Sequence, residues 1–193
     1  MSLDQKEILA IFRETGALLE GHFILTSGLH SQVYFQCAKV FQYPLYSEKI
    51  CQETAAHFKN QPIDLVVSPA VGGIIFGYEL ARQLGVRSVF TERIEGKMSL
   101  RRGFEIKPGE KVLVAEDVTT TGSSVREVVE TVRDKGGEVL AVTAVVDRSG
   151  GKVDFGVPYY SLVQMEIRNY KQKDCPSCKE GSRAEKPGSR GNK

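Results

Sequence analysis

The stretch VLVAEDVTTTGSS, residues 112–124, joins a buried strand to a polar turn that opens a helix. Its first four residues are apolar and predict the strand, at whose carboxyl end Glu116 and Asp117 stand side by side. In open α/β sheets, ligands bind at the carboxyl ends of the parallel strands. The hydroxyl- and glycine-rich turn that follows predicts a helix N-terminus whose free backbone N–H groups can bind a phosphate.

The order of these groups indicates a phosphorylated ribose. Adjacent carboxylates repel phosphates, but they accept hydrogen bonds from a pair of ribose hydroxyls. A plain strand-to-helix turn with a threonine cap is the alternative, and it leaves unexplained the cost of two carboxylates at the end of a buried strand. The stretch lacks the GxxxxGK[ST] lysine of nucleotide-binding P-loops and the GxGxxG pattern of dinucleotide sites.

Apolar runs alternate with helix-like segments on both sides of this stretch. Short runs predict strands at residues 33–36, 63–70, 86–93, 111–117, 138–148 and 159–165. Helical spacing and caps predict helices at residues 3–20, 47–60, 72–84 and 122–135. Such alternation predicts an α/β fold, in which a mostly parallel twisted sheet is flanked by helices. We expect about the first 45 residues to form a small hood over one end of the sheet.

The length of 193 residues fits one domain with its own hydrophobic core. We expect a single domain over residues 1–170, hood included, and a basic, flexible tail over residues 171–193. The tail has seven Lys or Arg and three Asp or Glu, a net charge of +4, while the remainder has 19 basic and 21 acidic residues, or −2. The Gly, Ser, Lys and Pro content of the tail favours a solvated terminus over a nucleic-acid contact.

The four cysteines do not indicate a disulfide framework. Cys37 and Cys51 stand in apolar or helical surroundings, where a reduced buried thiol is expected. Cys175 and Cys178 form a CPSC pair in the polar tail. A zinc site needs two further ligands, and all three histidines precede residue 60. We therefore interpret this pair as incidental and expect no dedicated metal ligands.

The composition, with 41% hydrophobic and 26% charged residues, is typical of a soluble globular enzyme. No apolar run approaches the ~20 residues that span a bilayer. The N-terminal sequence MSLDQKEILAIF lacks the apolar stretch of a signal peptide. We therefore expect a cytoplasmic protein with neither a membrane nor a nucleic acid as partner.

VLVAEDVTTTGSS resembles the signature of type I phosphoribosyltransferases, which bind phosphoribosyl pyrophosphate (PRPP) with an acidic pair and a loop of small residues. SPAVGGIIFG, residues 68–77, is similar to the pyrophosphate loop of that family, where backbone amides stand at another helix N-terminus. The resemblance implies the type I phosphoribosyltransferase fold. The residues it assigns to PRPP binding are Glu116, Asp117, Val118, Thr119, Thr120, Thr121, Gly122, Ser123, Ser124, Val71 and Gly72.

A charged segment between residues 91 and 111 is too long for a simple connection, which predicts a lid or a disordered loop with a hairpin-like return. It resembles the mobile catalytic loop of orotate phosphoribosyltransferases. Cations there would stabilise the charge on a departing pyrophosphate, and closure would exclude water from the sugar. Lys97 is the main catalytic candidate, together with Arg93 and Arg101. A solvated charged loop is the alternative.

GHFILTSGLHSQVYFQCAKV, residues 21–40, resembles the N-terminal segment of the orotate enzymes, and other members of the family carry a different hood. Tyr34 and Phe35 are expected to lie against a flat pyrimidine, with a half-buried strand pair as the alternative. Arg148 and Thr120 match the orotate-binding residues of the family. A guanidinium suits this role because it binds a carboxylate through two parallel hydrogen bonds.

The resemblance extends over about residues 3–170. It implies transfer of the ribose 5-phosphate group from PRPP to orotate, giving orotidine 5′-monophosphate and pyrophosphate in de novo pyrimidine biosynthesis. It also implies Mg²⁺ carried on PRPP and a homodimer whose lid residues reach the site of the neighbouring subunit. A purine or uracil phosphoribosyltransferase and a non-catalytic PRPP-sensing regulator are the alternatives. The regulator is disfavoured because no helix-turn-helix segment accompanies the fold.

Overall fold

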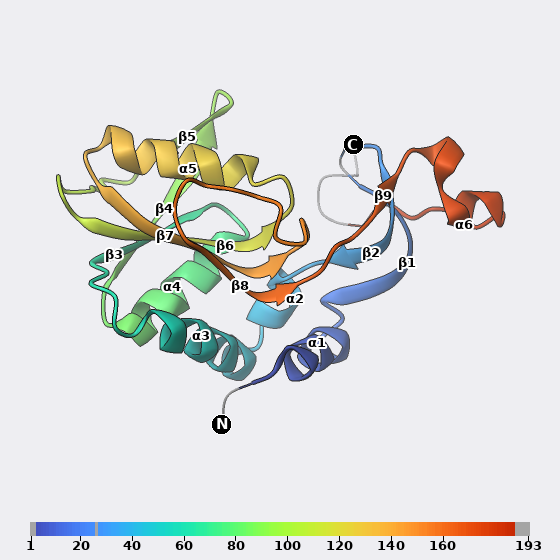
Figure 1. Ribbon diagram of the computed structural model, residues 1–193, viewed down its shortest axis with the longest axis horizontal. Coiled ribbons are helices and arrows are strands. Elements are labelled where there is room, and N and C mark those ends of the chain that lie inside the picture. Colours follow the sequence, from blue (N-terminus) through green and yellow to red (C-terminus); the bar gives the residue numbers. More distant parts are fainter. Residues whose placement is uncertain (1–2, 26, 188–193) are drawn as a thin grey trace.

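A twisted six-stranded sheet forms the centre of the computed structural model, which describes residues 3–25 and 27–187 (Figure 1). The strand order is β5-β4-β3-β6-β7-β8, and only β5 runs antiparallel to its neighbour. The strands are β3 Leu65–Pro69, β4 Arg87–Ile94, β5 Lys97–Leu100, β6 Lys111–Thr119, β7 Glu138–Asp147 and β8 Tyr159–Gln164. The predicted α/β fold with a mostly parallel sheet is therefore confirmed.

Helices cover both faces of this sheet (Figure 1). Helix α5, Ser123–Asp134, packs on one face, while α3, Pro44–Phe58, and α4, Gly73–Leu84, cover the other. In β6, Val112 and Val114 belong to the core under α5, whereas Leu113 belongs to the core under α3 and α4. This alternation follows from the two-residue period of a strand and explains why the central strands are apolar throughout. None of the helices described is both long and apolar enough to cross a membrane.

The N-terminal region forms the expected hood, but its first helix is shorter than predicted. Helix α1, Gln5–Glu14, ends where Thr15 caps it and Gly16 takes a left-handed φ of +65°. Residues 18–20, predicted to be helical, instead begin β1, Leu18–Ile24, which pairs with β2, His30–Phe35. Pairing across the hairpin therefore outweighs the helical spacing of these leucines. The short α2, Ala38–Phe41, follows, and Thr26 lies outside the described residues.

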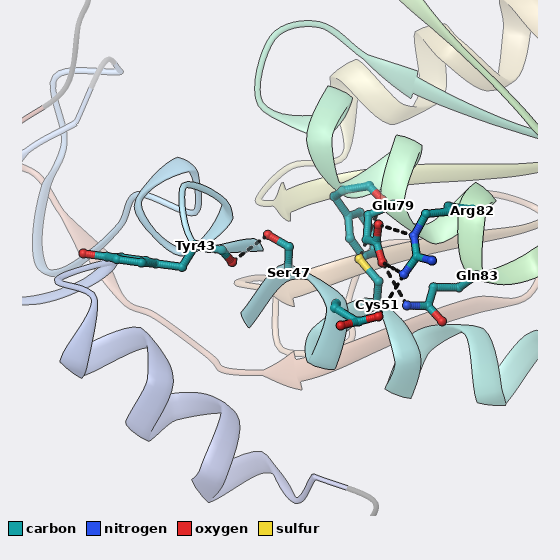
Figure 2. Close-up of polar contacts among 8 residues, drawn as sticks. Tyr43, Ser47, Cys51, Glu79, Arg82 and Gln83 are labelled. Carbon is teal, nitrogen blue, oxygen red and sulfur yellow. Dashed lines mark hydrogen bonds and ion pairs between the residues drawn. The ribbon is translucent and has the colours of Figure 1, made fainter. Parts of the chain in front are cut away.

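Helix α3 begins three residues before the predicted start at Ser47, because Pro44 supplies its first turn. The Ser47 hydroxyl donates to the carbonyl of Tyr43 at 3.2 Å instead of capping the helix, as Figure 2 shows. Arg82 of α4 ties the two helices together. It contacts Glu79 at 2.8 Å and Glu48 of α3 at 3.0 Å.

The C-terminal segment, residues 169–187, packs against the hood, whereas the sequence predicts a flexible tail from residue 171. Strand β9, Asn169–Tyr170, pairs with β2, and the turns η1, Gln172–Asp174, and α6, Pro176–Lys179, follow beside β1 and β2 (Figure 1). The Glu185 N–H donates to the carbonyl of His22 at 2.8 Å, and its carbonyl accepts from the N–H of Ile24 at 2.7 Å. Backbone pairing of this kind is not visible in the polar composition of the segment. Residues 188–193 of the predicted tail lie outside the described residues.

Candidate active site

The acidic pair lies at the carboxyl end of β6, as the sequence predicts. Glu116 is buried, with 8% of its surface exposed, and Asp117 is partly exposed. The Asp117 N–H donates to Glu116 Oε1 at 3.1 Å, and the Val118 N–H donates to Asp117 Oδ1 at 2.9 Å. Burial, with the nearby charge of Asp117, raises the pKa of Glu116 well above its ordinary value. Each carboxylate keeps acceptor positions for hydroxyl groups.

The loop after β6 leads into the N-terminus of α5 and lines a small hollow. Its lining residues are Glu116, Val118, Thr119, Thr120, Thr121, Gly122, Ser123, Ser124 and Val125. The hydroxyls of Thr121 and Ser123 lie 3.2 Å apart, and Arg126 of the first turn donates to the Thr121 carbonyl at 2.7 Å. Free N–H groups, hydroxyls and the positive end of the helix dipole together suit a phosphate.

Gly122 is required at the start of α5 for two reasons. Its φ is +74°, and a Cβ added there would lie 2.6 Å from Val153 and 2.8 Å from Phe155. We expect Gly122→Ala to lower the free energy of unfolding by about 3 kcal/mol, part from the left-handed backbone and part from overpacking. Chemical denaturation measures this loss. Gly109→Ala is the matched control, since Gly109 has a φ of +76° but open space around it. An equal loss in both variants would contradict the packing argument.

The loop after β3 meets the acidic pair from the neighbouring strand. The Ala70 N–H donates to the Thr91 carbonyl at 2.7 Å, and the peptide bond between Ala70 and Val71 is cis. A Cβ on Gly72 would lie 2.7 Å from a carboxylate oxygen of Asp117, so a larger residue there would require the Asp117 side chain to move. Val71 remains 81% exposed. The two predicted PRPP loops are thus adjacent in space although more than forty residues separate them in the chain.

Arg148 lies beside the carboxyl end of β6, where the loop that leads to α5 begins. The backbone N–H of Arg148 donates to the Thr119 carbonyl at 2.8 Å, and this hydrogen bond holds the residue against the end of β6. Burial lowers the pKa of its guanidinium, and the proximity of Tyr34 opposes that shift. Its Nε and Nη2 are buried and have no hydrogen-bond partner within the described part of the chain. A buried cation with unused donors is costly unless an anion binds to it.

The two aromatic residues proposed to contact the base point in different directions. Phe35 is only 7% exposed and packs edge-on against Phe12 in the core, with ring centroids 5.8 Å apart. The expectation that its ring lies against a pyrimidine is therefore wrong, because neighbouring residues of a strand face opposite sides. Tyr34 is partly exposed, lies near Arg148 and donates to Gln36 Oε1 at 3.3 Å.

The charged segment begins as a β-hairpin, as the predicted hairpin-like excursion requires. Strands β4 and β5 pair across a turn at Glu95 and Gly96, so Lys97 stands next to the tip. Arg93 is tied to α5 by an ion pair with Glu127 at 2.8 Å. Among residues 3–25 and 27–187, the exposed side chains of Lys97 and Arg101 make no hydrogen bond and no ion pair within 4.0 Å, although Arg101 lies close enough to Glu92 to help lower the pKa of that carboxyl. These two cations are therefore available to a ligand, whereas Arg93 is already engaged.

Comparison with known proteins gives the same assignment. Residues 46–176 match the family model for the phosphoribosyl transferase domain. The orotate phosphoribosyltransferase of Caldanaerobacter subterraneus subsp. tengcongensis is 55% identical over 188 residues, which are 97% of this chain and 99% of that protein. The orotate phosphoribosyltransferase of Pelotomaculum thermopropionicum is 57% identical over 188 residues, which again are 97% of this chain and 99% of that protein. The chain belongs to the orotate phosphoribosyltransferase family.

A crystal structure of the orotate phosphoribosyltransferase from Aeropyrum pernix shares the fold. It superimposes with a TM-score of 0.69 at 24% sequence identity and covers 81% of this chain and 92% of that one. At this identity the likeness concerns the fold alone. The fold places the loops after β3 and β6 at one edge of the sheet, where ligands of open α/β sheets bind.

The raised pKa of Glu116 predicts how stability depends on pH in this orotate phosphoribosyltransferase family member. In the unfolded chain this carboxyl has its ordinary pKa of 4.5, and in the folded chain it loses its proton at higher pH. Between these values the folded state holds more protons, so this group lowers stability as pH rises through the window. We expect Glu116→Gln to melt at a higher temperature than the wild type above the window, with a difference that shrinks toward pH 4.5. Thermal denaturation of the ligand-free protein across pH measures it.

Glu130→Gln is the control for this comparison, because Glu130 is an exposed residue of α5. It should leave the pH profile of the wild type unchanged. A Glu116→Gln variant whose melting temperature stays parallel to the wild type at every pH would contradict the prediction.

A second cluster of polar side chains lies outside this site, in the hood. His22 and His30 of the hood lie against Cys175 and Cys178 of the C-terminal segment. In the sequence only the CPSC pair points to this cluster, because the two histidines stand about 150 residues away in the chain. The interpretation of that pair as incidental does not take account of these contacts.

Proposed function

We propose that this chain is an orotate phosphoribosyltransferase that transfers the ribose 5-phosphate group of PRPP to orotate, releasing pyrophosphate, in pyrimidine biosynthesis. The observation that carries the choice of orotate is the guanidinium of Arg148, whose buried Nε and Nη2 have no hydrogen-bond partner among the residues that the structure describes. The curated relatives at 55–57% identity support the same substrate. A base without a carboxylate would leave these donors unpaired.

PRPP is bound in this proposal by the two adjacent loops. The turn from Thr120 to Ser124 holds the 5-phosphate at the N-terminus of α5, where free N–H groups and hydroxyls converge. Glu116 and Asp117 accept hydrogen bonds from the two ribose hydroxyls. Backbone amides around Val71 and Gly72 hold the pyrophosphate, because Gly72 lets that loop approach Asp117 closely.

Orotate lies between the hood and the sheet. Arg148 binds its carboxylate, Thr120 contacts its ring edge, and Tyr34 provides an aromatic surface on the hood side. This arrangement presents the ring nitrogen to C1 of the sugar. Such orientation of two substrates accounts for a large part of the catalysis, since no covalent nucleophile is needed.

Mg²⁺ accompanies PRPP in this proposal. The two adjacent carboxylates at the end of β6 offer hard oxygen atoms, the donors that Mg²⁺ prefers. When bound, the ion neutralises charge on the pyrophosphate. The sulfur and imidazole donors of His22, His30, Cys175 and Cys178 are unsuited to Mg²⁺, so we do not assign that cluster to the magnesium of PRPP.

A homodimer would complete the site by supplying lid cations from the partner. Helix α4 exposes 47% of Ile75 and 66% of Tyr78, one turn apart, while Phe76 and Leu80 on its other side are buried. An apolar face of this kind on a helix is typical of an interface, and we assign it to a second copy of the chain.

The experiment that tests the proposal is an assay of the purified chain with PRPP and Mg²⁺. We expect loss of orotate and formation of equal amounts of orotidine 5′-monophosphate and pyrophosphate. Hypoxanthine, adenine and uracil should give no product under the same conditions. Binding of PRPP without turnover of any base would instead indicate a regulator, and product from a purine would overturn the choice of orotate.

A further inference from the structure

The cluster of His22, His30, Cys175 and Cys178 has no role in the reaction described above. His22 lies in β1 and His30 begins β2. Cys175 directly precedes α6, and Cys178 lies within that helix. One ligand atom from each residue lies within 4.8 Å of every other. We propose that these four side chains bind a zinc ion, which fastens the C-terminal segment to the hood.

The spacing of the four donor atoms is close to that of a tetrahedral site. Zn–S bonds of about 2.3 Å and Zn–N bonds of about 2.0 Å place neighbouring sulfur and nitrogen ligands about 3.5 Å apart. The Cys175 Sγ lies 3.5 Å from His22 Nε2, and the Cys178 Sγ lies 3.6 Å from the same atom and 3.4 Å from His30 Nδ1. His22 Nε2 and His30 Nδ1 are 2.7 Å apart. Two nitrogen ligands of a tetrahedral zinc lie about 3.3 Å apart, so the two imidazoles would have to separate by only about 0.6 Å.

A second contact sets the protonation state that a metal ligand needs. The other ring nitrogen of His22, Nδ1, lies 3.0 Å from the carbonyl oxygen of Ser182 and donates its hydrogen there. This hydrogen bond leaves the Nε2 lone pair of His22 facing the cluster. Metal-bound histidines commonly use their second nitrogen in this way. His22 therefore has the tautomer of a ligand and not only the position of one.

Burial gives an independent reason to expect a metal. His22 is 6% exposed, His30 is 5% exposed and Cys175 is fully buried, so these polar groups have little access to water. In the described structure they contact chiefly one another. Two thiolates and two neutral imidazoles would satisfy Zn²⁺ with no open position, which is the pattern of a structural site and not of a catalytic one.

The position of the cluster explains its purpose. Apart from the cluster, the contacts between the C-terminal segment and the hood are few: the short β9, the backbone hydrogen bonds of Glu185, and a hydrogen bond of 3.4 Å from Gln32 Nε2 to the Ser177 hydroxyl. A zinc ion would join residues about 150 positions apart in sequence and would hold the β1–β2 hairpin, which also carries Tyr34. Since such a site does not exist in the unfolded chain, zinc binding adds directly to the stability of the fold.

Metal analysis of the full-length chain, purified with a reductant and dialysed after exposure to zinc, tests the proposal. We expect one zinc per chain in the wild type. Cys178→Ser and His22→Ala should each lose it. The matched controls are Cys51→Ala and His57→Ala, a cysteine and a histidine outside the cluster, which should keep it. Zinc retained in both cluster variants, or absent from the wild type, would overturn the proposal.

Two measurements on the wild-type chain decide the matter even where a variant fails to fold. Replacement of zinc by cobalt should produce the absorption of a tetrahedral site with thiolate-to-cobalt charge transfer. Removal of zinc with a chelator should lower the melting temperature by at least about 5 °C, restored by Zn²⁺ and not by Mg²⁺. A Cys175–Cys178 disulfide in the reduced preparation, or cobalt spectra without thiolate bands, would count against the site.

Discussion

Replacing Lys97 with alanine should lower kcat by about 100-fold or more, the loss typical of a group that stabilises charge in the transition state. Lys97 stands beside the tip of the β4–β5 hairpin. Its side chain is exposed and makes no ion pair or hydrogen bond in the part of the chain that the structure describes. In the proposed reaction, negative charge grows on the pyrophosphate as the bond to C1 breaks, and the ammonium group of Lys97 would stabilise that charge in the transition state. The KM for orotate should change little. Steady-state kinetics with each substrate varied separates the two effects.

Lys107→Ala is the matched control, since Lys107 is also an exposed lysine of the charged segment but lies beyond the hairpin. It should retain wild-type turnover. Equal losses in the two variants would point to the net charge of the segment, and unchanged turnover in Lys97→Ala would contradict a role for Lys97 in the lid.

Mixed dimers test whether the lid acts on the neighbouring subunit. A subunit with Lys97→Ala and one with Arg148→Leu are each expected to be nearly inactive alone. If the lid reaches across the dimer, the mixed dimer contains one site with an intact Arg148 and an intact Lys97, so activity returns. If each lid covers its own site, both sites of the mixed dimer remain defective. Co-expression with two different affinity tags gives the mixed dimer for the assay.

Arg148→Leu should raise the KM for orotate by about 100-fold, because removing one partner of a buried charge pair leaves the substrate carboxylate unpaired. Binding of PRPP should change much less, since the hydrogen bond that Arg148 makes to Thr119 at the end of β6 uses its backbone N–H, which leucine keeps. The same variant should be at least as stable as the wild type without ligand. Burial of the guanidinium opposes its charge, as its lowered pKa indicates, and leucine removes that cost.

Arg148→Lys separates charge from geometry at this position. A lysine keeps the positive charge but cannot make two parallel hydrogen bonds to a carboxylate, so we expect an intermediate KM. Steady-state kinetics gives the KM for orotate, calorimetric titration gives the affinity for PRPP, and thermal denaturation gives the stability of the free protein. A large loss of PRPP affinity, or a destabilised apo protein, would contradict the assignment of Arg148 to orotate.

Local sequence determined most of the fold and one half of the site. The apolar run of β6, its two terminal carboxylates and the small residues before α5 all lie within residues 112–124, so strand, turn and helix cap could be predicted together. The helix predicted over residues 3–20 extends beyond the observed α1 because Leu18 and Leu19 fit both helical spacing and a strand. Only their pairing with β2 decides that they belong to a strand. Short-range patterns cannot register a partner that lies elsewhere in the chain.

Tertiary structure alone decided which side chains are available to ligands and which are not. Phe35 enters the core, Arg93 is paired with Glu127, and two donors of Arg148 have no partner within residues 3–25 and 27–187. None of these outcomes follows from residue type. The C-terminal segment shows this most clearly. Its polar composition predicted a free tail, yet β9 and Glu185 pair with the hood and bring Cys175 against His22. Ligand clusters and ion pairs depend on distances across the fold, and these arise only when the sheet and the hood pack together.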